Sequence, residues 1–166
     1  APSEYDETFN RIIGGFADDY LTSAHQSMAN ACCTGNGTRA LYFAWEPITR
    51  FSEGIATVNL FLNRASAWMD VDSYLPYEGK VVLRNKQAHT TMIRMPYWVD
   101  QARLKVFLND RAIRSKAIGN FRHVDGLSPG DTIRVEFPVA ETTEIYTICG
   151  TKYTAKFRGS TVVDIL

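Results

Sequence analysis

The sequence contains few of the residues that build disulfide frameworks and metal sites. Among its 166 residues there are three cysteines and three histidines. Three cysteines are an odd number and too few for a disulfide framework, so they indicate either a reducing compartment or a metal site. Two of them, Cys32 and Cys33, are adjacent. The cysteine pair is therefore the first place to look for chemistry.

The chain also lacks an excess of charge of either sign. Its 18 basic and 18 acidic residues give a formal net charge of zero. Nucleic acids and anionic membranes both favour a basic protein surface. We therefore expect neither a nucleic-acid partner nor a membrane partner.

Long apolar runs are absent as well. No stretch approaches the roughly 20 apolar residues of a membrane span, and the start at Ala1-Pro2-Ser3-Glu4 has neither the n-region nor the h-region of a signal peptide. These absences favour an intracellular location. With 45% hydrophobic and 22% charged residues, the composition is typical of a globular domain that can bury a core.

The cysteine pair precedes a glycine-rich turn. Adjacent side chains diverge on a helix or a strand, so both thiols cannot enter one apolar core. Gly35-Asn36-Gly37-Thr38 predicts a tight turn with an N-cap, followed by a helix from Thr38 to Ala44 or Ile48. The positive end of that helix would favour thiolate over thiol, which suits a metal or a nucleophile.

Other interpretations of the pair stay open. A single free cysteine is most often a small buried hydrophobe. A vicinal disulfide is rare because its ring strains the peptide between the two residues. A zinc site needs about four ligands, usually at spacings such as C-x₂-C, so the spacing alone is weak evidence for metal.

Two helices are predicted in the first third of the chain. Glu4 to Leu21 has apolar residues at helical spacing and is interpreted as an amphipathic helix. The second helix, which carries Leu41, Tyr42 and Trp45, is apolar nearly all round and must be buried on several sides. Either it packs on the following β region or its neighbours lie outside this chain. Ser52-Glu53-Gly54 marks the predicted boundary, which gives a helical segment 1–53 and a β domain 54–166.

Short strands separated by turn residues fill the rest of the chain. The patterns of alternation predict strands at 57–62, 65–71, 80–84, 88–95, 103–108, 112–114, 120–124, 132–137, 143–148, 153–157 and 161–165. Asn109-Asp110-Arg111 is a predicted hairpin turn. The fold class we expect is mainly β: an antiparallel β-sandwich preceded by two α-helices.

Several other residues invite a functional interpretation. Asp70, Asp72 and Glu78 lack the glycine and the bidentate glutamate of a calcium loop, so we interpret them as a solvated turn. Aromatic side chains could form a platform for a sugar ring, although packing is the commoner role; these are Tyr74, Tyr77, Tyr97 and Trp98. Cys149 is interpreted as a structural thiol, and the three histidines as solvated or satisfied side chains; they are His25, His89 and His123.

Four ordered segments resemble one enzyme family. Cys32 to Tyr42, with Ala44-Trp45-Glu46 after it, resembles the cysteine-pair motif of glycoside hydrolase family 127, the β-L-arabinofuranosidase-like enzymes. Downstream, further stretches resemble that family's "R-I-P-x-W", "V-x-V-N-G" and "W-x-P-G-D-x-V" segments; they are Ile93–Trp98, Val106–Asn109 and Leu127–Ile133. The matches correspond to the C-terminal part of the family's chain only.

The resemblance implies a retaining glycosidase with an (α/α)₆ barrel followed by β-sandwich domains, and a carbohydrate substrate. It implies that Cys32 is the nucleophile and a zinc ligand, that Cys33 is a second zinc ligand, and that a separate glutamate is the acid/base. The acid/base glutamate and two zinc ligands have no counterpart in this chain, and the two predicted helices resemble the end of the barrel. We therefore expect this chain alone to be inactive, and to self-associate or to associate with the rest of a barrel. A non-catalytic carbohydrate-binding module and a structural accessory domain remain the alternatives.

Overall fold

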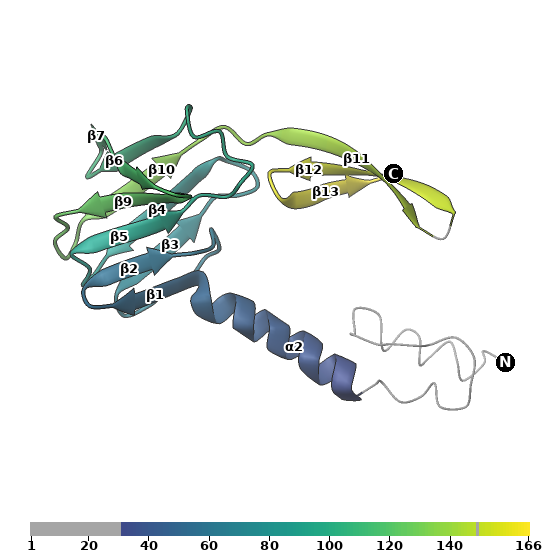
Figure 1. Ribbon diagram of the computed structural model, residues 1–166, viewed down its shortest axis with the longest axis horizontal. Coiled ribbons are helices and arrows are strands. Elements are labelled where there is room, and N and C mark those ends of the chain that lie inside the picture. The colour runs from purple at the N-terminus through teal and green to yellow at the C-terminus, as the bar shows by residue number, and fades with distance from the viewer. Residues whose placement is uncertain (1–30, 149) are drawn as a thin grey trace. The chain divides into compact units, whose positions relative to one another are not determined.

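The computed structural model describes residues 31–148 and 150–166, with no side-chain description for 31–34 and 148 (Figure 1). The chain divides into two compact units, Ala1–Glu46 and Pro47–Leu166. The predicted helix Glu4–Leu21 lies outside the described residues. Of the expected architecture, the mainly β fold and the sandwich are confirmed in the described part of the chain.

The described part of the first unit is one α-helix, α2 (Ala31–Trp45). It begins seven residues earlier than Thr38, so the predicted tight turn before the helix is wrong. Thr38 does not cap the helix, because its hydroxyl donates back to the carbonyl of Gly35 at 3.0 Å, three residues earlier. Gly35 and Gly37 each cost a helix about 1 kcal/mol relative to Ala, which weakens the helix without ending it.

The helix ends at a short 3-10 turn, η1 (Glu46–Ile48), and a strand follows at once. Pro47 cannot continue an α-helix, because it has no N–H to donate. The strand β1 (Thr49–Ser52) pairs with β2 (Ile55–Val58), so residues that we assigned to the helical segment belong to the β unit. Glu53 and Gly54 between them both have positive φ, 52° and 77°. Two such residues form the tight hairpin turn whose twist matches that of the strands.

Two five-stranded sheets form the sandwich. Sheet A has the order β1-β2-β5-β9-β8, with β5 (Thr90–Arg94), β9 (Phe121–Asp125) and β8 (Lys116–Ile118). Sheet B has the order β3-β4-β10-β6-β7, with β3 (Met69–Ser73), β4 (Lys80–Asn85), β10 (Thr132–Glu136), β6 (Lys105–Leu108) and β7 (Arg111–Ile113).

One pair of strands departs from the antiparallel expectation. β2 and β5 are parallel, in the register Ile55↔Thr90 to Val58↔Ile93. The chain leaves sheet A after β2, forms β3 and β4 in sheet B, and returns to lie beside β2. A parallel pair needs such a long connection, whereas neighbouring antiparallel strands need only a turn.

The core lies between these two sheets. Inward-facing residues of both contribute, and the side chains of Ile93 from sheet A and of Leu83 and Ile133 from sheet B are 0% exposed. Phe61 and Phe137 stack within this core with ring centroids 5.8 Å apart. Each such side chain stabilises the fold by about 1.5–3 kcal/mol relative to leaving it in water.

A third sheet, sheet C, follows the sandwich in the sequence. It is a three-stranded antiparallel meander of β11 (Glu141–Ile148), β12 (Thr151–Arg158) and β13 (Thr161–Ile165). The register places Tyr146 opposite Tyr153, and Ala155 opposite Ile165, on one face. Lys156 and Asp164 pair on the other face. The first face is thus mainly apolar, with Glu144 opposite Ala155, and the second is mainly polar, with Ile145 opposite Thr154.

Candidate functional site

The cysteine pair lies in the first turn of α2, at the second and third residues of the helix. Their side chains are outside the described residues, so the predicted roles of Cys32 and Cys33 are not tested by their surroundings. This position is consistent with the expectation that the positive end of a helix favours the thiolate. The N–H groups of a first helical turn have no acceptor within the helix, and their positive potential favours a thiolate.

The part of the chain that the structure describes was compared with the ligand set of a metal site. The described residues contain no group of three or more histidine, cysteine, aspartate or glutamate side chains that could hold a metal ion. This part of the chain therefore does not by itself supply the four ligands of a zinc site. No helix within it has the length and hydropathy that a membrane span requires.

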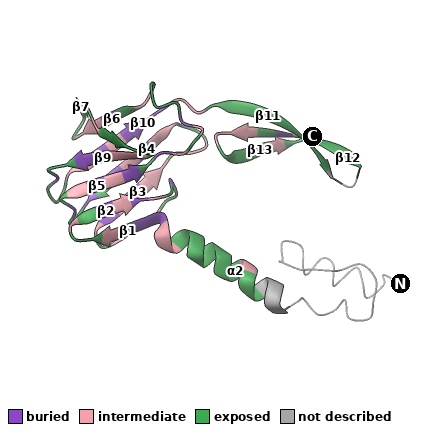
Figure 2. Ribbon diagram, in the orientation of Figure 1, coloured by how far each residue is buried: buried purple, intermediate pink, exposed green. Residues whose placement is uncertain are grey.

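The rest of α2 presents large apolar side chains to solvent. Leu41, Tyr42 and Phe43 are 63%, 56% and 62% exposed, and Figure 2 shows the exposed class along most of the helix. The ring of Tyr42 lies 6.0 Å from the rings of both Phe43 and Trp45.

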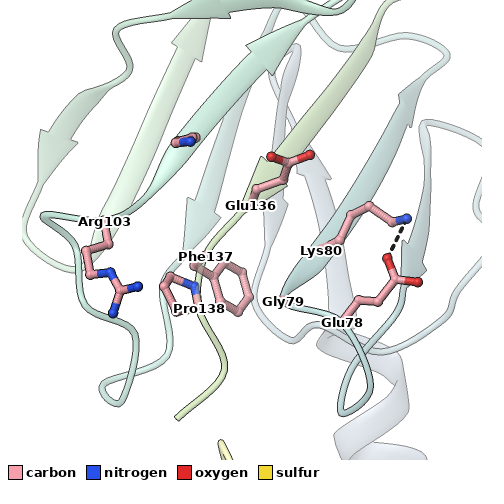
Figure 3. Close-up of a pocket in the computed structure, with 8 residues that line it drawn as sticks. Glu78, Gly79, Lys80, Arg103, Glu136, Phe137 and Pro138 are labelled. Carbon is pink, nitrogen blue, oxygen red and sulfur yellow. Dashed lines mark ion pairs between the residues drawn. The ribbon is translucent and has the colours of Figure 1, made fainter.

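A hollow of about 620 Å³ opens in sheet B, where β4 begins and β10 ends (Figure 3). Its charged lining comes from Glu78, Lys80, Arg103, Lys105 and Glu136. Lys80 pairs with Glu78 at 2.8 Å, and this hydrogen bond raises the pKa of the lysine. Mixed charge of this kind can bind a polar ligand.

Gly79 shapes the wall of this hollow. Its carbonyl accepts a 2.8 Å hydrogen bond from the N–H of Phe137, and an added Cβ would overlap the backbone carbonyl of Phe137. Only glycine allows the two backbones to approach so closely. The shape of the hollow therefore depends on this one residue type.

The predicted aromatic platform divides into packed and exposed members. Trp98 is half-buried and meets the edge of Phe137 with centroids 5.6 Å apart, so it belongs to the core packing. Tyr74 carries the Lys80 ammonium 3.7 Å above its ring. Tyr77 and Tyr97 are 83% and 97% exposed, and only these two are free to stack on a ligand.

The three carboxylates that we considered for calcium are each paired with a cation. Asp70 meets Lys86 at 2.6 Å, Glu78 meets Lys80, and Asp72 meets Arg84. The hydrogen bond from Lys86 lowers the pKa of Asp70. Asp70 and Asp72 lie within β3, so the predicted solvated turn is wrong for these two.

The described histidines carry no catalytic arrangement. His123 Nδ1 lies 3.0 Å from a carboxylate oxygen of Asp125, and the Thr90 hydroxyl donates to the other oxygen at 2.9 Å. The threonine thus faces the aspartate and not the imidazole. His89 lies beside Gly54. His25 and Cys149 fall outside the described residues.

Sequence reasoning missed a concentration of positive charge. Residues 103–122 contain six cations and one acid, Asp110. They lie on β6 to β9 and the turns between them, at the edge of the sandwich. A second hollow, of about 370 Å³, lies here and is lined in part by Lys105, Arg114 and Arg122. A charge count in a moving window would have found the segment, because the neutral total hides it.

Together these features define a β-sandwich protein with a cysteine-bearing helix ahead of the sandwich in the sequence and a cationic sandwich edge. No family model matches the sequence, and no curated protein gives a significant match. Solved structures do match. The chain is similar to a family 127 β-L-arabinofuranosidase from Geobacillus stearothermophilus T6, with a TM-score of 0.57 and 18% identity over 81% of this chain and 24% of that one.

Two further solved structures are also similar to this chain. One is described as a glycoside hydrolase, with a TM-score of 0.63 and 16% identity over 88% of this chain and 28% of that one. The other is a family 127 β-arabinofuranosidase, with a TM-score of 0.63 and 17% identity over 81% of this chain and 26% of that one. The chain therefore has the fold of part of these enzymes and spans about a quarter of their length.

Proposed function

We propose that this chain is part of a retaining glycoside hydrolase that acts on β-L-arabinofuranosides and uses Cys32 as its nucleophile. The observation that carries the proposal is the agreement of two independent findings. The fold is shared with family 127 enzymes over most of the chain, and the sequence segment that resembles their cysteine-pair motif lies in the first turn of a helix.

The chemistry proposed for Cys32 balances in two steps. The thiolate attacks the anomeric carbon, and the bond from that carbon to the leaving oxygen breaks as a carboxylic acid protonates the oxygen. Water, deprotonated by the same carboxylate, then displaces the sulfur and restores the thiolate. The segments that resemble the family include no counterpart of its acid/base glutamate, so we assign the acid to a segment beyond this chain.

For zinc, the proposal names the residues of this chain that would bind the ion. Cys32 and Cys33 would hold it together with donors from elsewhere in a longer polypeptide, since the segments that resemble the family include no counterpart of its remaining ligands. When bound, zinc would keep the sulfur as thiolate and make it a better leaving group. A two-ligand fragment should bind the ion far more weakly than a closed site.

The test uses the complete gene product. We expect about one zinc per chain, hydrolysis of a chromogenic β-L-arabinofuranoside, and loss of turnover in Cys32→Ser with an unchanged circular dichroism spectrum. The matched control is Cys149→Ser, which removes the one thiol that does not belong to the pair and should keep the wild-type rate. Full activity in Cys32→Ser would remove the nucleophile assignment.

A second candidate is a structural accessory role for this chain when it stands alone. The exposed apolar residues of α2 favour it, because a monomeric protein rarely presents so many large side chains together. On this view the sandwich supports a helical domain and α2 packs into that domain. Sedimentation of the isolated chain tests it: we expect self-association, and its suppression by Tyr42→Ser with Phe43→Ser. A wild-type chain that stays monomeric at high concentration would argue against it.

A further inference from the structure

The cations at the sandwich edge come from both sheets. β7 is the last strand of sheet B and β8 is the last strand of sheet A, and only Arg114 and Ser115 separate them in the chain. The edge is therefore continuous across the two sheets. It carries Arg103, Lys105, Arg111, Arg114, Lys116 and Arg122.

Most of these cations have no partner. Within the described residues, the side chains of five of them make no hydrogen bond or ion pair; they are Arg103, Lys105, Arg111, Arg114 and Lys116. Elsewhere in the same sandwich the cations are paired, as in Lys86 with Asp70 and Lys80 with Glu78. The acid within the segment, Asp110, pairs with Arg134 on β10 at 3.2 Å. The edge therefore carries an excess of positive charge, although Glu136 lies opposite Lys105 in the sheet register and lines one hollow with Arg103 and Lys105.

The hollow at this edge combines that charge with an apolar floor. Leu104, Phe107 and Ile113 contribute apolar lining, while Lys105, Arg114 and Arg122 contribute cations. Arg122 is held in place by its Nη2, which donates to the Oε1 of Gln101 at 2.8 Å. Its Nε is buried and has no hydrogen-bond partner among the described residues.

A simpler explanation is protection of the sheet edges. Exposed edge strands often carry lysine or arginine, which prevents edge-to-edge pairing with another chain. Acidic residues would protect an edge as well as basic ones, and cations that form ion pairs with acids would protect it as well as unpaired cations. Six cations with one acid instead repel one another, and a polyanion would relieve that repulsion. The excess of cations is therefore better explained by binding of an anionic ligand than by protection of the sheet edges.

We propose that this edge binds an anionic polysaccharide that carries uronate carboxylates, at a site separate from the cysteine pair. The proposal rests on the proposed glycoside hydrolase function, because the fold shared with such enzymes favours a glycan over other polyanions. A carboxylate matches the guanidinium fork of Arg114. The C–H face of a sugar ring matches the apolar floor of the hollow.

The experiment measures binding of the 166-residue chain to an oligogalacturonate by calorimetry, beside a neutral arabino-oligosaccharide and a single-stranded DNA of similar charge. We expect the oligogalacturonate to bind most tightly, and its affinity to fall as salt is raised. Lys105→Ala with Arg114→Ala should weaken it by about tenfold or more, the effect of losing charge-assisted hydrogen bonds. Both residues are exposed, so the fold should persist.

The matched control removes two positive charges from sheet C, through Lys152→Ala with Lys156→Ala. It should change the affinity for oligogalacturonate by less than about twofold. An equal loss in this control, tighter binding of DNA than of oligogalacturonate, or no binding by the wild type would each overturn the proposal. Binding at this edge does not require Cys32, so the affinity for oligogalacturonate should be unchanged in Cys32→Ser. A failure of the hydrolase proposal would therefore leave this binding result unaffected.

Discussion

The sandwich of sheets A and B and the small sheet C use the same alternation of apolar and polar residues, with opposite results. On β10 of the sandwich, Ile133 and Val135 are 0% exposed. β12 of sheet C alternates in the same way, with Tyr153, Ala155 and Phe157 between polar residues, yet Tyr153 is 39% exposed. Alternation along a strand therefore specifies which face is apolar, whereas burial depends on a second layer that must come from elsewhere.

The two regions also differ in what stabilises them. The sandwich has a core of side chains from both sheets, and buried polar groups that fasten its turns. In sheet C, Ala155 is buried, but its aromatic neighbours Tyr146 and Tyr153 stay exposed. A three-stranded sheet without a packed face has little beyond its hydrogen-bond ladder. We expect the sandwich to be the stable part of the β unit and sheet C to add little.

The largest expected effect is a cavity in the sandwich. Ile133→Ala removes a fully buried side chain between the two sheets and should lower the free energy of unfolding by about 2–5 kcal/mol. Urea denaturation followed by circular dichroism measures it. A loss below about 1 kcal/mol would mean that the two sheets do not share the tight core described above.

A smaller effect is expected from the buried amide that fastens two turns of the sandwich. Asn85 is 2% exposed, and its side chain donates to the carbonyls of Ala88 and Ser128 at 2.8 and 2.9 Å. Asn85→Ala leaves these groups unpaired, which should cost about 1–3 kcal/mol. Thermal unfolding checks it, with the exposed Asn36→Ala on α2 as the control that should change nothing.

Asp131 supplies a pH-dependent contribution to the sandwich. Hydrogen bonds from the Asn109 side chain and from the N–H of Ser128 hold the pKa of Asp131 below its usual 3.8. The stabilisation is therefore present above pH 3.8 and is lost as pH falls through the lower folded-state pKa. Asp131→Asn should cost about 1 kcal/mol at neutral pH, and should remove this part of the acid sensitivity. Unfolding curves between neutral pH and pH 2 measure both; an unchanged acid slope would contradict the assignment.

The smallest effect should come from the same substitution placed in sheet C. Ile165→Ala truncates an exposed side chain and should change the stability of this chain by less than about 0.5 kcal/mol. Ile133→Ala and Ile165→Ala are the same substitution, so the difference between their effects on stability compares the sandwich with sheet C. If Ile165→Ala costs as much as Ile133→Ala, the apolar face of sheet C is covered in solution. The same comparison in a longer polypeptide would show whether a further layer packs there.

Local patterns predicted much of the sandwich. The strand at 80–84 and the hairpin at Asn109-Asp110 are confirmed, because alternation and turn residues act over a few positions. β1 and β8 were missed: β8 has three exposed residues and no alternation of burial, so its pairing with β9 is not visible in its own sequence. The parallel pairing of β2 with β5 depends on a return of the chain over more than 30 residues, which no local signal records.

The candidate sites differ in the same way. The cysteine pair could be recognised from adjacent residues, although the start of its helix was misplaced, because Gly35 and Gly37 were interpreted as a turn. The charge-rich segment 103–122 could have been found by counting charges along the sequence, whereas the hollow that Lys105 and Arg122 both line depends on the placement of β6 and β9 at one edge of the sandwich. Chemistry contained in one segment is thus visible in sequence, and chemistry assembled from several strands requires the fold.

The central claim is that Cys32 is a glycosidase nucleophile, and covalent labelling tests it most directly. The complete gene product would be treated with an electrophile shaped like L-arabinofuranose, and the labelled peptide would be mapped by mass spectrometry. We predict one adduct per chain on Cys32, none on Cys33 or Cys149, and protection by excess substrate. An adduct spread over all three cysteines, or an active enzyme whose Cys32 stays unlabelled while a carboxylate takes the label, would contradict the account.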